Sequence, residues 1–187
     1  AINADGGSTC WGAGSGLDIP EGHIVAVSSG HKGNCAILID GSILCGGNIA
    51  AAADGPFKQV AAGDGWGCGL LVNGQVECFG PGAPTPLPEG AAHAGASSGP
   101  FVWLTAGYDH ACAIGVSGEV TCWGSMAGEI PAGVGPWLQL DGNYGRTCGI
   151  TADEVVHCWP PLPGGETPVS ITVCGDGIVG GEEVCDD

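Results

Sequence analysis

Four stretches of the chain repeat one pattern, in which two cysteines lie ten positions apart with a turn signal between two apolar runs. The four copies read CAILIDGSILC (35–45), CGLLVNGQVEC (68–78), CAIGVSGEVTC (112–122) and CGITADEVVHC (148–158). An Asn-Gly or Asp-Gly pair between apolar runs is the strongest local signal for a β-hairpin. A hairpin with an odd-length or Gly-bulged loop places its flanking cysteines side by side, within reach of a disulfide. We therefore expect four hairpin disulfides: Cys35–Cys45, Cys68–Cys78, Cys112–Cys122 and Cys148–Cys158.

The chain has 187 residues and eleven cysteines, and this paired pattern indicates an oxidising compartment. A zinc site would need much shorter steps between its cysteines than the local pairs show. Cys10, Cys174 and Cys185 lie outside the hairpin pattern. Cys10 can pair with Cys185 or with Cys174, and we favour one of these; alternatively Cys174 pairs with Cys185 and Cys10 has no partner.

A second shared piece begins eleven positions before the first cysteine of each hairpin. Each copy starts with a large apolar residue and has another apolar residue three positions later: Ile24 and Val27, Phe57 and Val60, Phe101 and Leu104, Trp137 and Leu140. The copies end in Gly30, Gly63, Gly107 and Asn143. Because Gly and Asn tolerate a positive φ, we expect short inner strands that end in sharp turns, with the apolar residues in the core.

A fifth copy of this piece, VSITVCG at 169–175, has no hairpin after it, whereas residues 1–12 match the end of a hairpin that has no inner strand before it. A last blade made from both chain ends would close a ring and remove exposed sheet edges. Periods of 33 to 44 residues between second cysteines are typical of propellers or solenoids. The expected fold is an all-β propeller of about five small blades over residues 1–175, followed by a tail at 176–187. Its repeats are 24–56, 57–100, 101–136, 137–168 and the composite 169–175 plus 1–12.

The charge balance limits the classes of partner that the chain can bind, because it has twenty acidic residues and only three basic ones. Nucleic acid and anionic lipid are poor partners for such a chain, and no apolar run is long enough to cross a membrane. The 38 glycines and 13 prolines, without a collagen period, predict many tight turns and closely packed strands.

The inner strand, the glycine, the hairpin and the closing Cys-Trp-Gly (10–12 and 122–124) together resemble the regulator of chromosome condensation repeat over about residues 1–175. That family folds as a β-propeller, usually of seven blades, and the resemblance implies a partner-binding rim. The paired cysteines resemble its extracellular bacterial branch, which speaks against nucleotide exchange on a GTPase and against chromatin binding. The tail CGDGIVGGEEVCDD (174–187) is similar to the start of a cysteine-rich repeat of myxobacterial surface proteins.

Ring geometry would place on one rim the loops between each inner strand and its hairpin, HKGN (31–34), DGWG (64–67), YDHA (108–111) and YGRT (144–147). Aromatic and arginine side chains are good binding anchors, and aromatic faces stack on sugar rings. The candidate ligand-binding residues are His31, Lys32, Asp64, Trp66, Tyr108, Asp109, His110, Tyr144 and Arg146.

We expect a secreted or cell-surface module, bacterial in type, that binds an extracellular protein or a glycan, with no cofactor. A structural subunit of a fibre or coat that binds copies of itself is the alternative. A glycan-active hydrolase or lyase would need converging carboxylates such as Asp64 and Asp109, and we expect no enzyme. Calcium is a weak further possibility at three oxygen-bearing turns, 63–65, 141–143 and 175–177, none of which has the EF-hand spacing.

Overall fold

A computed structural model describes residues 2–3, 9, 24–49, 51–83, 100–125, 130–161 and 169–170. They form four small antiparallel sheets, so the all-β expectation is confirmed. The first sheet contains β1 (Ile24–Ser29), β2 (Gly33–Leu38), β3 (Ile43–Gly47) and β4 (Ala52–Ala53). The second contains β5 (Phe57–Ala62), β6 (Gly67–Leu71) and β7 (Val76–Phe79), and the third β8 (Phe101–Ala106), β9 (His110–Gly115) and β10 (Val120–Gly124). The fourth contains β11 (Trp137–Asn143), β12 (Arg146–Thr151), β13 (Val155–Trp159) and β14 (Val169–Ser170).

The second and third strands of each sheet form the predicted hairpin. The two cysteines of each hairpin are direct cross-strand partners, with Cα atoms 4.0–4.1 Å apart, and all four predicted disulfides are present. Gly41, Gly74 and Gly118 have φ angles of 83–86° at the turns, where a side chain would be strained. In the fourth hairpin the same position holds Glu154 with φ of 64°. Cys10, Cys174 and Cys185 lie outside the described residues.

The first strand of every sheet carries a β-bulge near its start. Side chains of a regular strand alternate between its faces, so residues three apart would point in opposite directions. The extra residue of the bulge resets this alternation. Phe57 and Val60, for example, are therefore both buried in one core cluster, while Lys58 between them is exposed. The apolar spacing seen in the sequence is thus the signature of a bulged strand.

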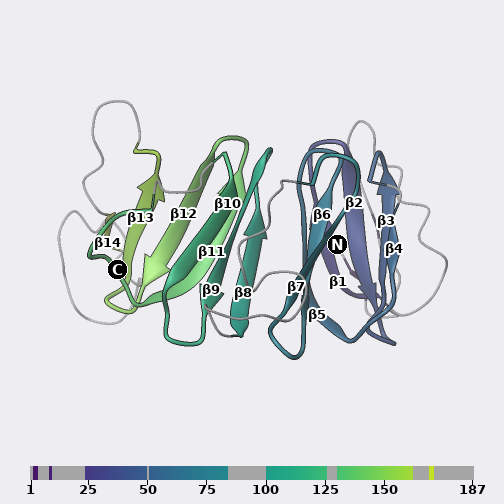
Figure 1. Ribbon diagram of the computed structural model, residues 1–187, viewed down its shortest axis with the longest axis horizontal. Helices are drawn as coiled ribbons and strands as arrows, with labels where there is room; N and C mark the ends of the chain where they lie inside the picture. Colours follow the sequence, from purple (N-terminus) through teal and green to yellow (C-terminus); the bar gives the residue numbers. More distant parts are fainter. Residues whose placement is uncertain are drawn as a thin grey trace, which may run out of the picture.

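The core lies between successive sheets rather than inside any one of them. Three buried clusters join the first sheet to the second, the second to the third, and the third to the fourth. Figure 1 shows the first sheet at one end of the long axis and the fourth at the other. Residues of all four first strands line one pocket of about 190 Å³, so these strands are the inner strands and face a common axis.

An inner strand leaves one backbone edge without a strand partner, and bonds from the neighbouring sheet cover it. A side chain of the preceding sheet bonds to the backbone of the next inner strand at each of the three interfaces. Ala62 N–H donates to Ser28 Oγ (3.0 Å), Leu104 N–H to Gln59 Oε1 (2.9 Å), Gln59 Nε2 to Leu104 O (2.8 Å), Trp103 Nε1 to Leu140 O (2.8 Å), and Gly142 N–H to Thr105 Oγ1 (2.7 Å). These bonds fix the register between sheets.

Two expectations need correction. Val169–Ser170 was expected to be the inner strand of a composite blade, but it pairs with Val155 and Val156 as the outermost strand of the fourth sheet. There it covers the open edge of β13, and the described residues confirm neither a fifth blade nor the closure of the ring. Of the predicted N-terminal part of that blade, residues 1–12, the structure describes only Ile2, Asn3 and Thr9, where the Asn3 and Thr9 side chains hydrogen-bond at 3.2 Å.

The glycines that follow the inner strands serve a different purpose from the one expected. Gly30, Gly63 and Gly107 do not have positive φ angles. They are required because other groups pack against their Cα atoms. A Cβ on Gly63 would lie 2.3 Å from the Trp66 indole, and a Cβ on Gly107 would lie 2.1 Å from the His110 ring. Gly63 and Gly107 therefore make room for a large side chain of their own loop, whereas a Cβ on Gly30 would lie 2.1 Å from the backbone oxygen of Gly63 in the next sheet.

Candidate functional site

The four loops that follow the inner strands gather at one end of the sheets, as ring geometry predicts. We call them the rim loops: residues 31–34, 64–67, 108–111 and 144–147. They surround the mouth of a pocket of about 290 Å³. Its lining combines small residues at the strand ends with three large side chains from the loops, His31, Tyr108 and Tyr144. The small residues leave the mouth open, so the large side chains alone set its shape.

An ionic cluster joins the first three rim loops around Asp64. Lys32 Nζ lies 2.8 Å from Asp64 Oδ2 and His31 Nδ1 lies 3.0 Å from Asp64 Oδ1. Only 9% of the Asp64 side chain is exposed, against 65% of His31 and 44% of Lys32. The hydrogen bond from Lys32, with smaller contributions from His31 and Tyr108, lowers the pKa of Asp64 to about 2 although burial opposes this. Asp64 is therefore a fixed negative charge at ordinary pH.

The same cluster orients Tyr108. Its hydroxyl donates a hydrogen bond to the Asp64 carboxylate, and this bond raises the pKa of Tyr108 because it stabilises the protonated phenol. The Lys32 ammonium lies 5.9 Å from the centre of the Tyr108 ring, within cation–π range. The Tyr108 backbone is held on both sides, by Asp64 N–H to Tyr108 O (3.3 Å) and Tyr108 N–H to Tyr144 O (3.1 Å).

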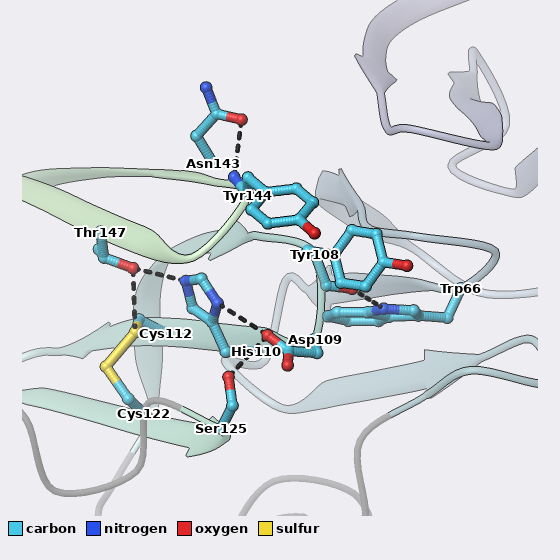
Figure 2. A network of polar contacts seen from close by, with 10 residues as sticks. All are labelled: Trp66, Tyr108, Asp109, His110, Cys112, Cys122, Ser125, Asn143, Tyr144 and Thr147. Atoms are coloured by element: carbon cyan, nitrogen blue, oxygen red, sulfur yellow. Dashed lines mark hydrogen bonds and ion pairs between the residues drawn. A yellow bond between two sulfur atoms is a disulfide. The ribbon is translucent and has the colours of Figure 1, made fainter. Parts of the chain in front are cut away.

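Tyr108 and Tyr144 form an aromatic pair at the pocket mouth. Their ring centres are 4.7 Å apart at an angle of 47°, and Figure 2 shows the two rings next to each other. Tyr144 is 70% exposed, which is unusual for a large aromatic residue. Asn143 Oδ1 accepts a hydrogen bond from Tyr144 N–H at 2.7 Å and shapes the end of this loop. The pair presents apolar ring faces next to a fixed carboxylate.

Trp66 was predicted to contact a ligand, but its side chain is in the core with 1% exposed. Its Nε1 donates a 2.9 Å hydrogen bond to Tyr108 O in the next loop, which Figure 2 shows from close by. The indole packs under Gly63 and belongs to the cluster between the second and third sheets. Trp66 therefore supports Tyr108 from below and does not reach the pocket mouth.

His110 is also fully buried, so it too is removed from the set of ligand-contacting residues. Its Nε2 lies 2.8 Å from Thr147 Oγ1 of the fourth rim loop, and its Nδ1 lies 3.7 Å from Asp109 Oδ1. Asp109 itself is exposed and accepts a 2.6 Å hydrogen bond from Ser125 Oγ. Figure 2 draws these contacts: the His110–Thr147 bond joins the third sheet to the fourth, and the contacts of Asp109 stay within the third repeat.

Arg146 is half-buried and directed along the fourth sheet, where its Nη2 lies 3.4 Å from Pro161 O. It is not among the residues that line the pocket. Of the predicted residues, His31, Tyr108 and Tyr144 line the pocket, and Lys32 and Asp64 adjoin them through the ionic cluster. The carboxylates Asp64 and Asp109 belong to separate clusters, since Asp64 is held by Lys32 and His31.

Sequence reasoning missed three residues that contact the predicted ones or line the pocket. Thr147 and Ser125 are the partners of His110 and Asp109, and Asn143 lines the mouth. Thr147 and Asn143 lie in or next to a rim loop, so their position in the repeat was an available signal. Ser125 lies sixteen residues after Asp109, and only the pairing of β10 with β9 brings the two together.

The described part of the chain contains no group of three His, Cys, Asp or Glu side chains arranged to hold a metal ion. Among those same residues there is no helix of the length and apolarity that a membrane span requires.

No protein-family model matches the chain, and no curated protein matches it. Solved structures do resemble it. The CRINKLY WD40 ectodomain of the Arabidopsis thaliana receptor kinase ACR4 is 26% identical with a TM-score of 0.61, covering 81% of this chain and 54% of that one. The ectodomain of the Physcomitrella patens receptor kinase CR4 is 23% identical with a TM-score of 0.63, covering 78% and 44%.

Prp20p from Saccharomyces cerevisiae, a yeast RCC1, is 11% identical with a TM-score of 0.61, covering 75% of this chain and 46% of that one. The chain thus spans about half the length of these neighbours. The four disulfides and the two receptor ectodomains point to an extracellular location, and the neighbours are consistent with an interaction module. Repeats, sheets and neighbours together give this chain the fold of the RCC1-like and WD40 β-propeller proteins.

Proposed function

We propose that the protein is a secreted or cell-surface binding module that captures a glycan at the pocket mouth formed by the rim loops. The observation that carries this proposal is the Tyr108–Tyr144 pair beside the Asp64 carboxylate. Aromatic side chains combine an apolar face with a polar tip, which suits a sugar ring that is apolar on its faces and carries hydroxyls at its edge. A carboxylate is a strong hydrogen-bond acceptor for such hydroxyls.

The size and charge of the site agree with a small neutral ligand. A pocket of about 290 Å³ is at the lower end of the range for small-molecule sites, roughly 300–1,000 Å³. Asp64 is paired with the Lys32 ammonium and hydrogen-bonded to His31, so an ionic ligand would have to compete with these internal bonds. A glycan residue can bind beside the cluster without breaking it.

A glycan array tests the proposal with the wild-type protein, Tyr144→Ala and a matched control, Val116→Ala. Val116 is equally exposed, at 64%, but follows β9 at the opposite end of the sheet from the rim loops. We expect binding to at least one glycan class, a loss of about tenfold or more with Tyr144→Ala, and none with Val116→Ala. Both variants should melt like the wild type.

A protein ligand is the second candidate, because Prp20p, whose reported binding is to Gsp1p and histones, shares the fold. No retention on a broad glycan array, together with capture of a surface protein that Tyr144→Ala abolishes, would favour it. Glycan binding that is unchanged in Tyr144→Ala would contradict the proposed site.

A further inference from the structure

Three interfaces inside the molecule repeat one arrangement. In each, apolar side chains of the hairpin in one sheet pack against the first and fourth residues of the next inner strand. The hairpin residues Cys35, Ile37, Ile43 and Cys45 meet Phe57 and Val60; Cys68, Leu70 and Val76 meet Phe101 and Leu104; Cys112, Ile114 and Cys122 meet Trp137 and Leu140. The side-chain-to-backbone bonds described above accompany this packing. Every interface therefore has a hairpin half and a strand half.

The fourth sheet carries a hairpin half that no described sheet covers. Its hairpin residues Cys148, Ile150 and Val156 are only half-buried, whereas almost all of their counterparts in the other sheets are buried. Gln139 holds the position of Gln59 and Asp141 the position of Ser28 and Thr105. Both are exposed, and neither side chain makes a hydrogen bond within the described residues. The fourth sheet therefore carries polar side chains at the positions that hydrogen-bond to the next inner strand in the other sheets, but here these side chains bond to no described residue.

The rim loop of the fourth sheet shows the same deficit. Trp66 and His110, three residues after the Gly63 and Gly107 that end their inner-strand segments, each bond to the following rim loop. Arg146 holds the equivalent position, and its buried Nε has no hydrogen-bond partner among the described residues. The apolar face, the inner strand and the rim loop of the fourth sheet thus all carry groups of the kind that contact a following sheet elsewhere in the molecule.

The first sheet carries the complementary strand half. Val27 holds the fourth position of its inner strand and is 42% exposed, whereas Val60, Leu104 and Leu140 at that position are 6%, 1% and 3% exposed. Figure 1 places this sheet at the end of the molecule opposite the fourth. The two ends of the molecule are therefore the two halves of the interface that is formed three times inside it.

The turn position shows which strand the fourth sheet fits. Gly41, Gly74 and Gly118 each accept a hydrogen bond from the first N–H of the next inner strand, and the proline before that strand packs against them. A Cβ on Gly74 would lie 2.3 Å from Pro100. The fourth sheet has Glu154 at this position, so a strand that follows a proline would clash there. Of the strands that open the four described sheets, β1 is preceded in the sequence by His23 and the others by proline.

From this complementarity we propose that the fourth sheet of one copy binds β1 of a second copy, head to tail, so that two copies close one ring. Ile150 and Val156 of one copy pack against Val27 of the other, next to Ile24, which is already buried within its own copy at 5% exposed. Gln139 bonds the backbone of Val27, as Gln59 bonds that of Leu104. A heterologous interface of this kind gives a closed ring when the rotation from one copy to the next returns to the first copy. When the rotation does not close, it gives a filament. The proposal is independent of the glycan site, although ring closure would place two sets of rim loops around one mouth.

Sedimentation equilibrium of the purified, oxidised protein tests the interface with Val27→Glu. Val27 is exposed on β1, so the variant should fold with all four hairpin disulfides intact, checked by circular dichroism and non-reducing peptide mapping. The matched control is Val25→Glu, two residues earlier on the same strand. Val25 is 55% exposed, and its counterparts Val102 and Leu138 are also exposed in sheets that do have a preceding neighbour, so this position is outside the interface.

We expect a dimer for the wild type and for Val25→Glu, and a dissociation constant raised about tenfold or more by Val27→Glu. Mixing Val27→Glu with Ile150→Glu supplies one intact interface, because each variant keeps the half that the other lacks. The mixture should therefore form a heterodimer although each variant alone is monomeric. A wild type that stays monomeric up to high micromolar concentration, a filament in place of a closed pair, or a dimer that Val27→Glu leaves unchanged would overturn the proposal.

Discussion

In the second and third rim loops, two positions that are two residues apart point in opposite directions. The residues that directly follow the closing Gly or Asn are His31, Asp64, Tyr108 and Tyr144, and they meet at the pocket mouth. The residues two places later, Trp66 and His110, turn into the core and bond to the next loop. Both positions carry residue types that bind ligands in other proteins, so position in the repeat, and not residue type, separates binding residues from supporting ones. Four predictions test this division.

Trp66→Ala should give the largest effect. It removes a buried indole and its hydrogen bond to Tyr108 O, and large-to-small changes of this kind cost about 3–5 kcal/mol. Denaturant unfolding with the disulfides intact measures the loss. Tyr144→Ala is the comparison, because its exposed ring should change the free energy of unfolding by no more than about 0.5 kcal/mol. Equal losses for the two variants would remove the proposed distinction.

Gly107→Ala should be next. The added Cβ would lie 2.1 Å from the His110 ring and 2.4 Å from Asn143 O, and overpacking of this kind costs about 1–3 kcal/mol. Gly145→Ala, in the fourth rim loop, is the matched control, because a Cβ there meets no atom within 4 Å. The difference in melting temperature between the two variants checks the prediction. A Gly107→Ala protein as stable as Gly145→Ala would show that His110 moves freely.

Thr147→Val should have a smaller effect of about 1 kcal/mol, the usual net contribution of a hydrogen bond. It keeps the shape of the side chain but removes the bond to His110 Nε2 between the third and fourth sheets. Thermal unfolding should detect the loss, and Thr147→Ser, which keeps the hydroxyl, should recover part of it. If Thr147→Ser were no more stable than Thr147→Val, the hydrogen bond would not be the cause.

The smallest effect should be a pH dependence from Asp64. Its folded pKa of about 2 is below the ordinary 3.8, so its charged form stabilises the fold above the ordinary value. This contribution is lost as the pH falls from about 4 through about 2. The melting temperature of the wild type should therefore approach that of Asp64→Asn over this range. Lys32→Met should weaken the pH dependence of the melting temperature, since Lys32 is the main cause of the lowered pKa of Asp64. A difference in melting temperature between the wild type and Asp64→Asn that does not vary with pH would contradict this account.

Much of the fold could be predicted from the sequence, because it is encoded locally. The paired cysteines fix each hairpin, and glycine marks the turn positions that need a positive φ. In the sequence the bulge appears only as an apolar spacing of three residues, from Phe57 to Val60. The strand register in the structure is needed to recognise this spacing as a bulge. The role of Gly63 could not be read at all, because it depends on where the Trp66 indole lies.

The site and the chain ends were harder to predict for the same reason. The sequence shows which loops meet, because their place in the repeat decides that. It does not show the direction of a side chain, so His110 and Trp66 were grouped with Tyr108 although they point into the core. Val169 resembles the start of an inner strand, but the open edge of β13 accepts it. Local pattern cannot decide between two edges that compete for one strand.

All four described disulfides lie within single hairpins, and none of them crosses from one sheet to the next. A pulling force applied along the chain therefore meets two kinds of resistance. Contacts between sheets can give way one at a time and re-form, while each hairpin stays locked as a short covalent loop that cannot be extended. For a protein exposed to shear outside a cell, the sheets can therefore separate reversibly while the hairpins remain folded.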